Sequence, residues 1–179
     1  MAKISNTVAY PSISNLDAAD YLVLTDAENN LKTKTATIAQ IQTLFGVDTN
    51  VTKTTINTGS LLTLADTPIT LVPAQGVGKV IDVISIMFYL DAGSQAYDYG
   101  TGSLPIKIGS EEIASIPNSS AVINSATDVV FKPEVPAGNN EIIAQNTALT
   151  LEAQANPTQG SGTLFVNVFY RVLTVGSSF

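Results

Sequence analysis

The stretch Gly162–Thr174, GTLFVNVFYRVLT, decides the fold, because its alternation is that of one long β-strand. Successive side chains of a strand point to opposite faces. One face is wholly apolar and should fill a core; it comprises Leu164, Val166, Val168, Tyr170 and Val172. The other face is aromatic but includes an amide and a guanidinium; it comprises Phe165, Asn167, Phe169, Arg171 and Leu173. Such a face suits neither water nor a core, so we predict that another sheet or another subunit covers it, and we assign its residues to a subunit interface.

A second stretch, residues 80–90, is also apolar on both faces, and we expect it to pair with Gly162–Thr174. Two central strands of this kind predict packed antiparallel sheets with one outer face covered by assembly. Other short apolar stretches are separated by turns rich in Pro, Gly, Asn and Ser, with no helix expected between them. We expect strands at 61–64, 69–72, 79–90, 104–108, 111–116, 128–131, 141–144, 148–153 and 163–174. The sequence therefore predicts a mainly β fold, an antiparallel jelly-roll-like β-sandwich over residues 59–179.

The composition excludes several classes of function. Charged residues make up only 13% of the 179 residues, and the net charge is −7. Lys32 and Lys34 are the only close pair of cations, so we reject nucleic acid as a ligand. The chain has no His and no Cys, which removes disulfides, thiolate metal sites and the commonest general base. No apolar run is long enough for a membrane-spanning helix, the N-terminus lacks a signal peptide, and we expect neither cofactor nor metal.

Residues 1–15 show no helical period, and Pro11 with scattered Ser and Asn favours an extended arm. The arm is either a frayed terminus or a peptide that becomes ordered against a partner. Its apolar side chains would give such a peptide something to bury; they are Ile4, Val8, Tyr10 and Ile13.

Residues 16–46 predict a small module of a β-hairpin and a short helix. We expect strands at 21–25 and 31–35 around an Asn-rich turn. Thr37 and Gln40 have the spacing of a capping box, and Gly46 ends the helix. Because the module is too small to be stable alone, its apolar stripe must rest on another surface. We assign that stripe, with the apolar residues of the arm, to an anchoring region; it comprises Leu16, Ile38, Ile41, Leu44 and Phe45.

Three phrases follow one another in this part of the chain: ISNL from Ile13, ADYLVL from Ala19 and LKTKTATIAQI from Leu31. In this order they resemble a module near the N-terminus of tailed-bacteriophage fibre and appendage proteins. The resemblance implies that the N-terminal region anchors the chain to a virion, ahead of a trimeric distal domain. The jelly-roll prediction fits it, because trimeric β-sandwich domains are common in phage head fibres, decoration proteins and receptor-binding heads. The Thr-rich residues 47–58 are a linker or a lead-in strand, and we place the domain boundary there.

Catalytic and metal-binding patterns are weak. Asp91 and Asp98 flank a Gly-rich loop, but their spacing matches no calcium loop, and the alternative is a solvated loop. Glu111 and Glu112 are adjacent on an expected strand, so they face opposite ways and cannot act as a glycosidase pair. Because the chain has no His, its Ser residues lack the usual general base that activates a Ser nucleophile. We therefore expect no enzymatic activity.

Arg171 and the loop at residues 97–99 each allow two interpretations. Arg171 either pairs with a carboxylate of a neighbouring strand, Asp82 being the candidate, or binds a carboxylate of the next protomer. The loop containing Tyr97, Asp98 and Tyr99 is either a recognition surface or a loop whose tyrosines pack beneath it.

Together these features predict a structural protein of the virion, located at the capsid surface rather than the tail. It would be a homotrimeric head fibre or capsid decoration protein whose partners are capsid or other virion proteins. The alternative is a tail-fibre or receptor-binding protein whose loops contact a host glycan or protein.

Overall fold

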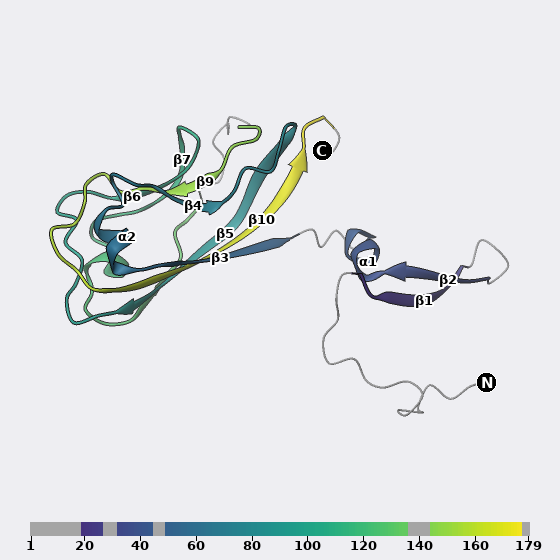
Figure 1. Ribbon diagram of the computed structural model, residues 1–179, viewed down its shortest axis with the longest axis horizontal. Coiled ribbons are helices and arrows are strands. Elements are labelled where there is room, and N and C mark those ends of the chain that lie inside the picture. Colours follow the sequence, from purple (N-terminus) through teal and green to yellow (C-terminus); the bar gives the residue numbers. More distant parts are fainter. Residues whose placement is uncertain (1–18, 27–31, 45–48, 136–143, 177–179) are drawn as a thin grey trace, which may run out of the picture. The chain divides into compact units, whose positions relative to one another are not determined.

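The computed structural model describes residues 19–26, 32–44, 49–135 and 144–176 (Figure 1). The chain divides into two compact units, Met1–Asp48 and Thr49–Phe179. Residues 1–18, with the proposed anchoring side chains Ile4, Val8, Tyr10, Ile13 and Leu16, lie outside the described residues, as does Phe45.

The first unit contains the predicted hairpin and helix. β1 (Tyr21–Asp26) and β2 (Lys32–Thr37) pair antiparallel, and α1 (Ile38–Leu44) follows directly. The capping box is present: the Gln40 backbone N–H donates to Thr37 Oγ1 at 3.1 Å, and the Thr37 N–H donates to Gln40 Oε1 at 2.9 Å. The Ile38 N–H also donates to the Asp20 carbonyl at 2.9 Å, which ties the start of the helix to the start of the hairpin.

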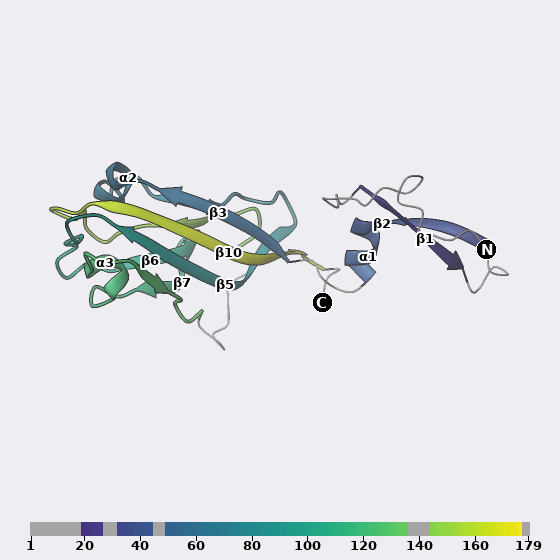
Figure 2. The same ribbon diagram turned by 90° about the horizontal axis from the view of Figure 1, so that it is seen from below.

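The second unit is a sandwich of two four-stranded sheets. The first sheet has the order β3 (Asn50–Ile56), β10 (Gly162–Thr174), β5 (Lys79–Ala92) and β8 (Val129–Phe131). Figure 2 shows β10 between β3 and β5. The second sheet has the order β4 (Ile69–Val72), β9 (Leu149–Leu151), β6 (Leu104–Ile108) and β7 (Glu111–Ile116). Every pairing is antiparallel, so the mainly β, antiparallel sandwich is confirmed, and the strand order is compatible with a jelly roll.

The core lies between the two sheets, where the inner faces of the strands meet. The pairing predicted for the two longest strands is present, with Leu164 opposite Leu90 and Val168 opposite Ile86. Phe88, Ile86 and Val166 from the first sheet are fully buried, as are Leu149 and Ile106 from the second. The apolar alternation read from the sequence therefore does place one face of each central strand in the core.

Two predictions differ from the structure, one pair of alternatives is decided, and one prediction falls mostly on residues that are not described. Residues 61–64 are not a strand, because Asn57 caps a short helix, α2 (Thr58–Leu62), by accepting from the Ser60 N–H at 3.0 Å. A second short helix, α3 (Ala121–Asn124), lies between β7 and β8, where none was expected. Within 47–58, residues 50–56 form β3 as an edge strand of the first sheet, so of the two alternatives the strand is the one observed. Of the strand expected at 141–144, only Ala144 is described, and it lies outside any strand.

Candidate functional site

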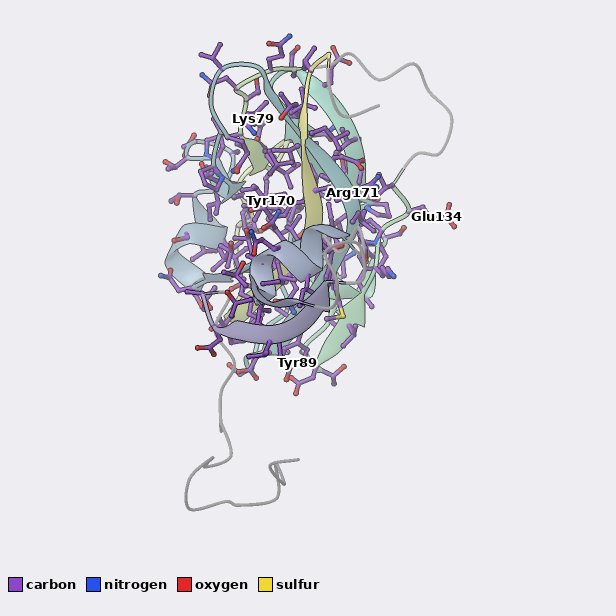
Figure 3. All side chains as sticks on the ribbon, turned by 90° about the vertical axis from the view of Figure 1, so that its right-hand side faces the viewer. Lys79, Tyr89, Glu134, Tyr170 and Arg171 are labelled. Atoms are coloured by element: carbon purple, nitrogen blue, oxygen red, sulfur yellow. The ribbon has the colours of Figure 1, made fainter. Side chains whose placement is uncertain are left out.

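The outer face of the first sheet carries the residues that the sequence assigned to a subunit interface. On β10 the inner residues Leu164, Val166 and Val168 are at most 1% exposed. The outer side chain of Phe165 is 36% exposed in the single chain. Figure 3 shows Tyr170 and Arg171 on opposite sides of the β10 ribbon, as the pleat requires.

One row of side chains crosses all four strands of this sheet. Phe165 lies opposite Thr55 of β3 on one side and Tyr89 of β5 on the other, and Tyr89 lies opposite Val130 of β8. The rings of Phe165 and Tyr89 stack, with centroids 5.8 Å apart and planes inclined by 21°. The row is therefore mostly apolar across the sheet, although it faces outward.

Asp128 holds Tyr89, one residue of this row, in place. The Tyr89 hydroxyl donates to Asp128 Oδ2 at 3.2 Å, and Asp128 Oδ1 accepts from the Ala92 N–H at 3.0 Å. The hydrogen bond between Tyr89 and Asp128 is the main cause of a raised pKa at Tyr89, and desolvation and the negative charge of Asp128 raise the pKa further. The phenol is thus held as a neutral donor in a defined position.

A second apolar region lies further along the strands, separated from the first by the row of Lys53, Asn167 and Met87. Phe169 of β10 lies opposite Val51 of β3, and Val51 is 47% exposed. The β10–β5 register shifts beside Phe169, and Ile84, at the shift, is also 47% exposed. Val130, at the far edge, is 64% exposed. We call this surface the aromatic face; it comprises Val51, Ile84, Tyr89, Val130, Phe165 and Phe169.

Arg171 pairs with Asp82 of the neighbouring strand, the first of the two alternatives for this residue. Arg171 Nε and Nη2 both donate to Asp82 Oδ2, at 2.9 and 2.5 Å. The two residues are cross-strand partners in the β10–β5 register. The pair lies on the outer side of the first sheet, beyond Phe169 along β10, and so borders the aromatic face.

The outer face of the second sheet is different. Its corresponding row consists of Thr70, Thr150, Lys107 and Glu112, which are cross-strand partners in turn. Lys107 Nζ donates to Glu152 at 2.7 Å. This face has the polar character expected of a surface in water.

The loop after β5 has both its tyrosines packed beneath it, which is the second of the alternatives for this loop. Tyr97 and Tyr99 are each 3% exposed. Their hydroxyls donate to the carbonyls of Gly162 at 2.9 Å and Leu61 at 3.2 Å, and burial raises the pKa of both phenols. Gly160 packs against the Tyr97 ring, where any Cβ would overlap it. Asp98 remains exposed.

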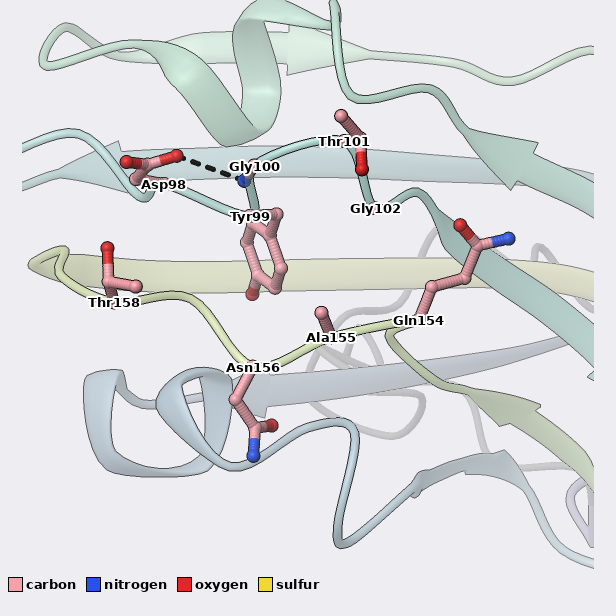
Figure 4. Close-up of a pocket in the computed structure, with 9 residues that line it drawn as sticks. All are labelled: Asp98, Tyr99, Gly100, Thr101, Gly102, Gln154, Ala155, Asn156 and Thr158. Atoms are coloured by element: carbon pink, nitrogen blue, oxygen red, sulfur yellow. Dashed lines mark hydrogen bonds between the residues drawn. The ribbon is translucent and has the colours of Figure 1, made fainter.

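The loop after β5 and the loop between β9 and β10 form a pocket of about 410 Å³ at one end of the sandwich. It is lined by residues 98–102 of one loop and by Gln154, Ala155, Asn156 and Thr158 of the other (Figure 4). Sequence reasoning pointed to Asp98 and missed the second loop, because residues about 55 positions apart come together only through the strand pairing.

The anchoring residues of the first unit are partly described. Ile38 and Ile41 are half-buried on α1, and Leu44 ends that helix. Leu22 and Val23 of β1 are 41% and 71% exposed. Because neighbouring strand residues point to opposite faces, this small hairpin exposes apolar groups on both sides.

Among the described residues, no group of three or more acidic side chains is placed to hold a metal ion. Glu111 and Glu112 are both exposed on β7, and Asp91 is exposed at the end of β5. None of the helices in the described parts of the chain has the length and apolarity needed to cross a membrane.

Comparison with known proteins gives likenesses of structure only. No family model matches the chain, and no curated protein matches it. A chain of the cyanophage Pam1 capsid asymmetric unit matches with 13% identity and a TM-score of 0.43, over 69% of this chain and 84% of that one. A chain of the acid-stable capsid of Helicobacter pylori bacteriophage KHP30 also matches with 13% identity and a TM-score of 0.43, over 71% and 92%. Similarity at this level does not establish a shared fold, so the functional argument rests on the residues of this chain.

Proposed function

We propose that this chain is a non-enzymatic structural protein of a tailed-phage virion, a trimeric head fibre or capsid decoration protein held on the particle by its N-terminal region. The observation that carries the proposal is the aromatic face. Phe165, Tyr89 and Val130 form an outward apolar row across three strands of the first sheet, while the corresponding row of the second sheet is polar. The N-terminal resemblance supplies the setting.

Self-association is the simplest way to cover this face. Full burial of an exposed Phe side chain contributes about 1.5–3 kcal/mol, and Phe165, which is 36% exposed, has roughly a third of that left to gain. Large contiguous apolar surfaces on soluble domains mark interaction sites. Phe165 and Tyr89 are already stacked, so they would enter an interface with little further loss of side-chain entropy.

The charges at the two edges of the sheet favour another copy as the covering partner. Exposed Lys53 lies on β3 at one edge, and exposed Asp128 lies beside β8 at the opposite edge. Placing the β3 edge of one copy beside the β8 edge of the next pairs Lys53 with Asp128 when the copies are shifted along the strands, whereas level edges bring Lys53 to exposed Lys132. Such a heterologous contact forms a closed ring when the rotation between copies allows it, and a trimer is such a ring.

The small N-terminal unit is suited to attachment. It exposes Leu22 and Val23, and its hairpin and short helix provide little core of their own. In a trimer, three such units would bind neighbouring sites on the particle, and their joint affinity would greatly exceed that of one.

The first test measures the molar mass of the full chain by size-exclusion chromatography with light scattering. We expect a trimer, and a stable monomer at micromolar concentration would reject the assembly step. The second test removes residues 1–46. The remainder should still fold and trimerise but should no longer attach to particles, and unchanged attachment would reject the anchoring role.

Location separates the two candidate virion roles. Gold-labelled antibodies against the sandwich should decorate the capsid if the protein is a head fibre or decoration protein. Labelling confined to the tail would favour the tail-fibre or receptor-binding role, which the pocket at the loop end of the sandwich would suit.

A further inference from the structure

We propose that the pocket between the loops 98–102 and 154–158 binds an uncharged, hydroxyl-rich ligand of the saccharide class. Its volume of about 410 Å³ lies within the range of small-molecule sites and matches a ligand of one or two sugar rings. The pocket lies on a surface distinct from the aromatic face, since it is built from loops at one end of the sandwich and not from the sheet (Figure 4).

Two side chains in the pocket are each held at one atom and open at the other. Asp98 Oδ1 accepts from the Gly100 N–H at 3.0 Å, and Gln154 Oε1 accepts from the Ser103 N–H at 3.1 Å. Asp98 Oδ2 and Gln154 Nε2 have no protein partner within the described parts of the chain. Asp98 and Gln154 lie at opposite ends of the lining in Figure 4, and each side chain is already ordered by its one hydrogen bond, so a ligand that reaches either one loses little entropy by ordering it.

The two loops are joined to each other, so the pocket has a defined shape. The Asp98 N–H donates to the Gln159 carbonyl at 3.2 Å, and the Thr158 N–H donates to the Asp98 carbonyl at 3.1 Å. The Gln154 N–H donates to the Ser103 carbonyl at 3.1 Å on the other side. The buried rings of Tyr97 and Tyr99 support the first loop from below. This support makes the site largely pre-formed.

The chemistry of the lining selects the ligand class. The lining contains no Lys or Arg and contains one carboxylate, so an anionic ligand would be repelled. Thr101 and Thr158 add hydroxyls that both donate and accept. A carboxylate, an amide and two hydroxyls complement groups that are donors and acceptors at once, and neighbouring sugar hydroxyls are such groups.

Given the proposed attachment to a particle, on which only this point rests, the position of the pocket suits a ligand outside the particle. The chain enters the sandwich at Asn50, which is level with Tyr170, whereas Ile56 is level with Leu164 at the other end. Six residues of strand separate the two levels, or about 20 Å. The pocket loops adjoin Ala92 and Gly162 beyond that far end. The pocket therefore lies at the end of the sandwich opposite to the end at which the chain enters it.

The test is saturation-transfer NMR on the full chain with glucose, galactose, mannose and N-acetylglucosamine, and with glucuronate as the anionic comparison. At about 10 mM sugar, above the millimolar Kd typical of weak sites, at least one neutral sugar should receive saturation and glucuronate should not. Asp98→Ala and Gln154→Ala should each weaken binding about tenfold. Glu111→Ala, which removes an exposed carboxylate on β7, should leave binding unchanged.

Absence of transfer to every neutral sugar would overturn the proposal, and so would binding that persists unchanged in both Asp98→Ala and Gln154→Ala. A preference for glucuronate would overturn the assigned ligand class. Thermal unfolding of each variant identifies any loss caused by misfolding; in that case Asp98→Asn, which keeps the size of the side chain but not its charge, replaces Asp98→Ala. Virion location plays no part in this measurement, so its failure is distinct from failure of the proposed function.

Discussion

The two outer faces of the sandwich differ row for row. Across the first sheet the row reads Thr55, Phe165, Tyr89 and Val130, whereas across the second it reads Thr70, Thr150, Lys107 and Glu112. Both rows belong to antiparallel sheets whose inner faces share one core. The fold therefore requires neither row to be apolar, because a sheet with a polar outer face is equally stable in water.

This difference separates the requirements of folding from those of assembly. A polar outer row like that of the second sheet would be sufficient if both faces met only solvent. The aromatic row instead exposes side chains whose burial would be favourable, and the ring stack and the Asp128 contact hold them in place. The aromatic face is thus where a change should alter assembly while leaving the sandwich folded.

The largest effect is expected from the core that both faces share. Phe88 is fully buried and immediately precedes Tyr89 on β5, so the two residues point to opposite sides of the same strand. Phe88→Ala should reduce the free energy of unfolding by about 3–5 kcal/mol through lost burial and a residual cavity. Tyr89→Ala should cost far less in a dilute sample. Urea unfolding at low protein concentration measures both, and equal losses would show that the outer face is itself part of the core.

The next largest effect is expected at the centre of the aromatic face. Phe165→Glu would place a charge inside the proposed contact, and it should weaken self-association by at least about 2 kcal/mol, or roughly thirtyfold in Kd. Thr70→Glu is the matched control, since it adds the same charge to the outer face of the second sheet. Sedimentation equilibrium measures association of both variants. If Thr70→Glu dissociates the assembly and Phe165→Glu does not, the two faces have the opposite roles.

Much of the fold could be predicted because alternation and turn residues act locally. β4, β6, β7 and β10 have the expected bounds, and the capping box at Thr37 was read directly from two residues. α2 was missed because Leu61 and Leu62 fall in a short apolar stretch that was taken for a strand, and because Asn57 was not recognised as a cap. β3 stayed ambiguous because a Thr-rich edge strand has little apolar pattern.

The candidate surfaces were harder to predict because they depend on register. The sequence of β10 predicted a covered outer face, but Val51 and Val130 join that face only through the pairing of distant strands. Ile84 joins it because the register shifts there, which no local pattern indicates. The pairing of Arg171 with Asp82 was one of two alternatives, and it could be named because the two long strands were already expected to pair.

A smaller effect is expected from the ionisation of Tyr89 at the aromatic face. Its pKa is raised above the ordinary value, so the folded state favours the neutral phenol. The stabilisation is therefore fully present below the pKa of an unfolded tyrosine, about 10, and is lost as pH rises through the higher folded value. Association of the wild-type chain should weaken over that alkaline range, and Tyr89→Phe should remove this part of the pH dependence. An unchanged profile in Tyr89→Phe would mean that the phenol lies outside the contact.

The smallest effects are expected from the two ion pairs, one on each outer face. Arg171 pairs with Asp82 and Lys107 pairs with Glu152, and all these side chains retain some exposure, from 25% to 50%. In a dilute monomer, Arg171→Gln and Lys107→Gln should each cost at most about 1 kcal/mol, because solvent screens exposed pairs. The losses of unfolding free energy in the two variants should differ once the chain assembles. A contact that covers the aromatic face also desolvates Arg171 and Asp82. Removing Arg171 then leaves Asp82 as a buried charge without a partner. Unfolding measured across a range of protein concentrations should therefore show a growing cost for Arg171→Gln and a constant one for Lys107→Gln. If both costs stay constant, the edge of the aromatic face near Arg171 remains in water, and the contact must be confined to the region around Phe165.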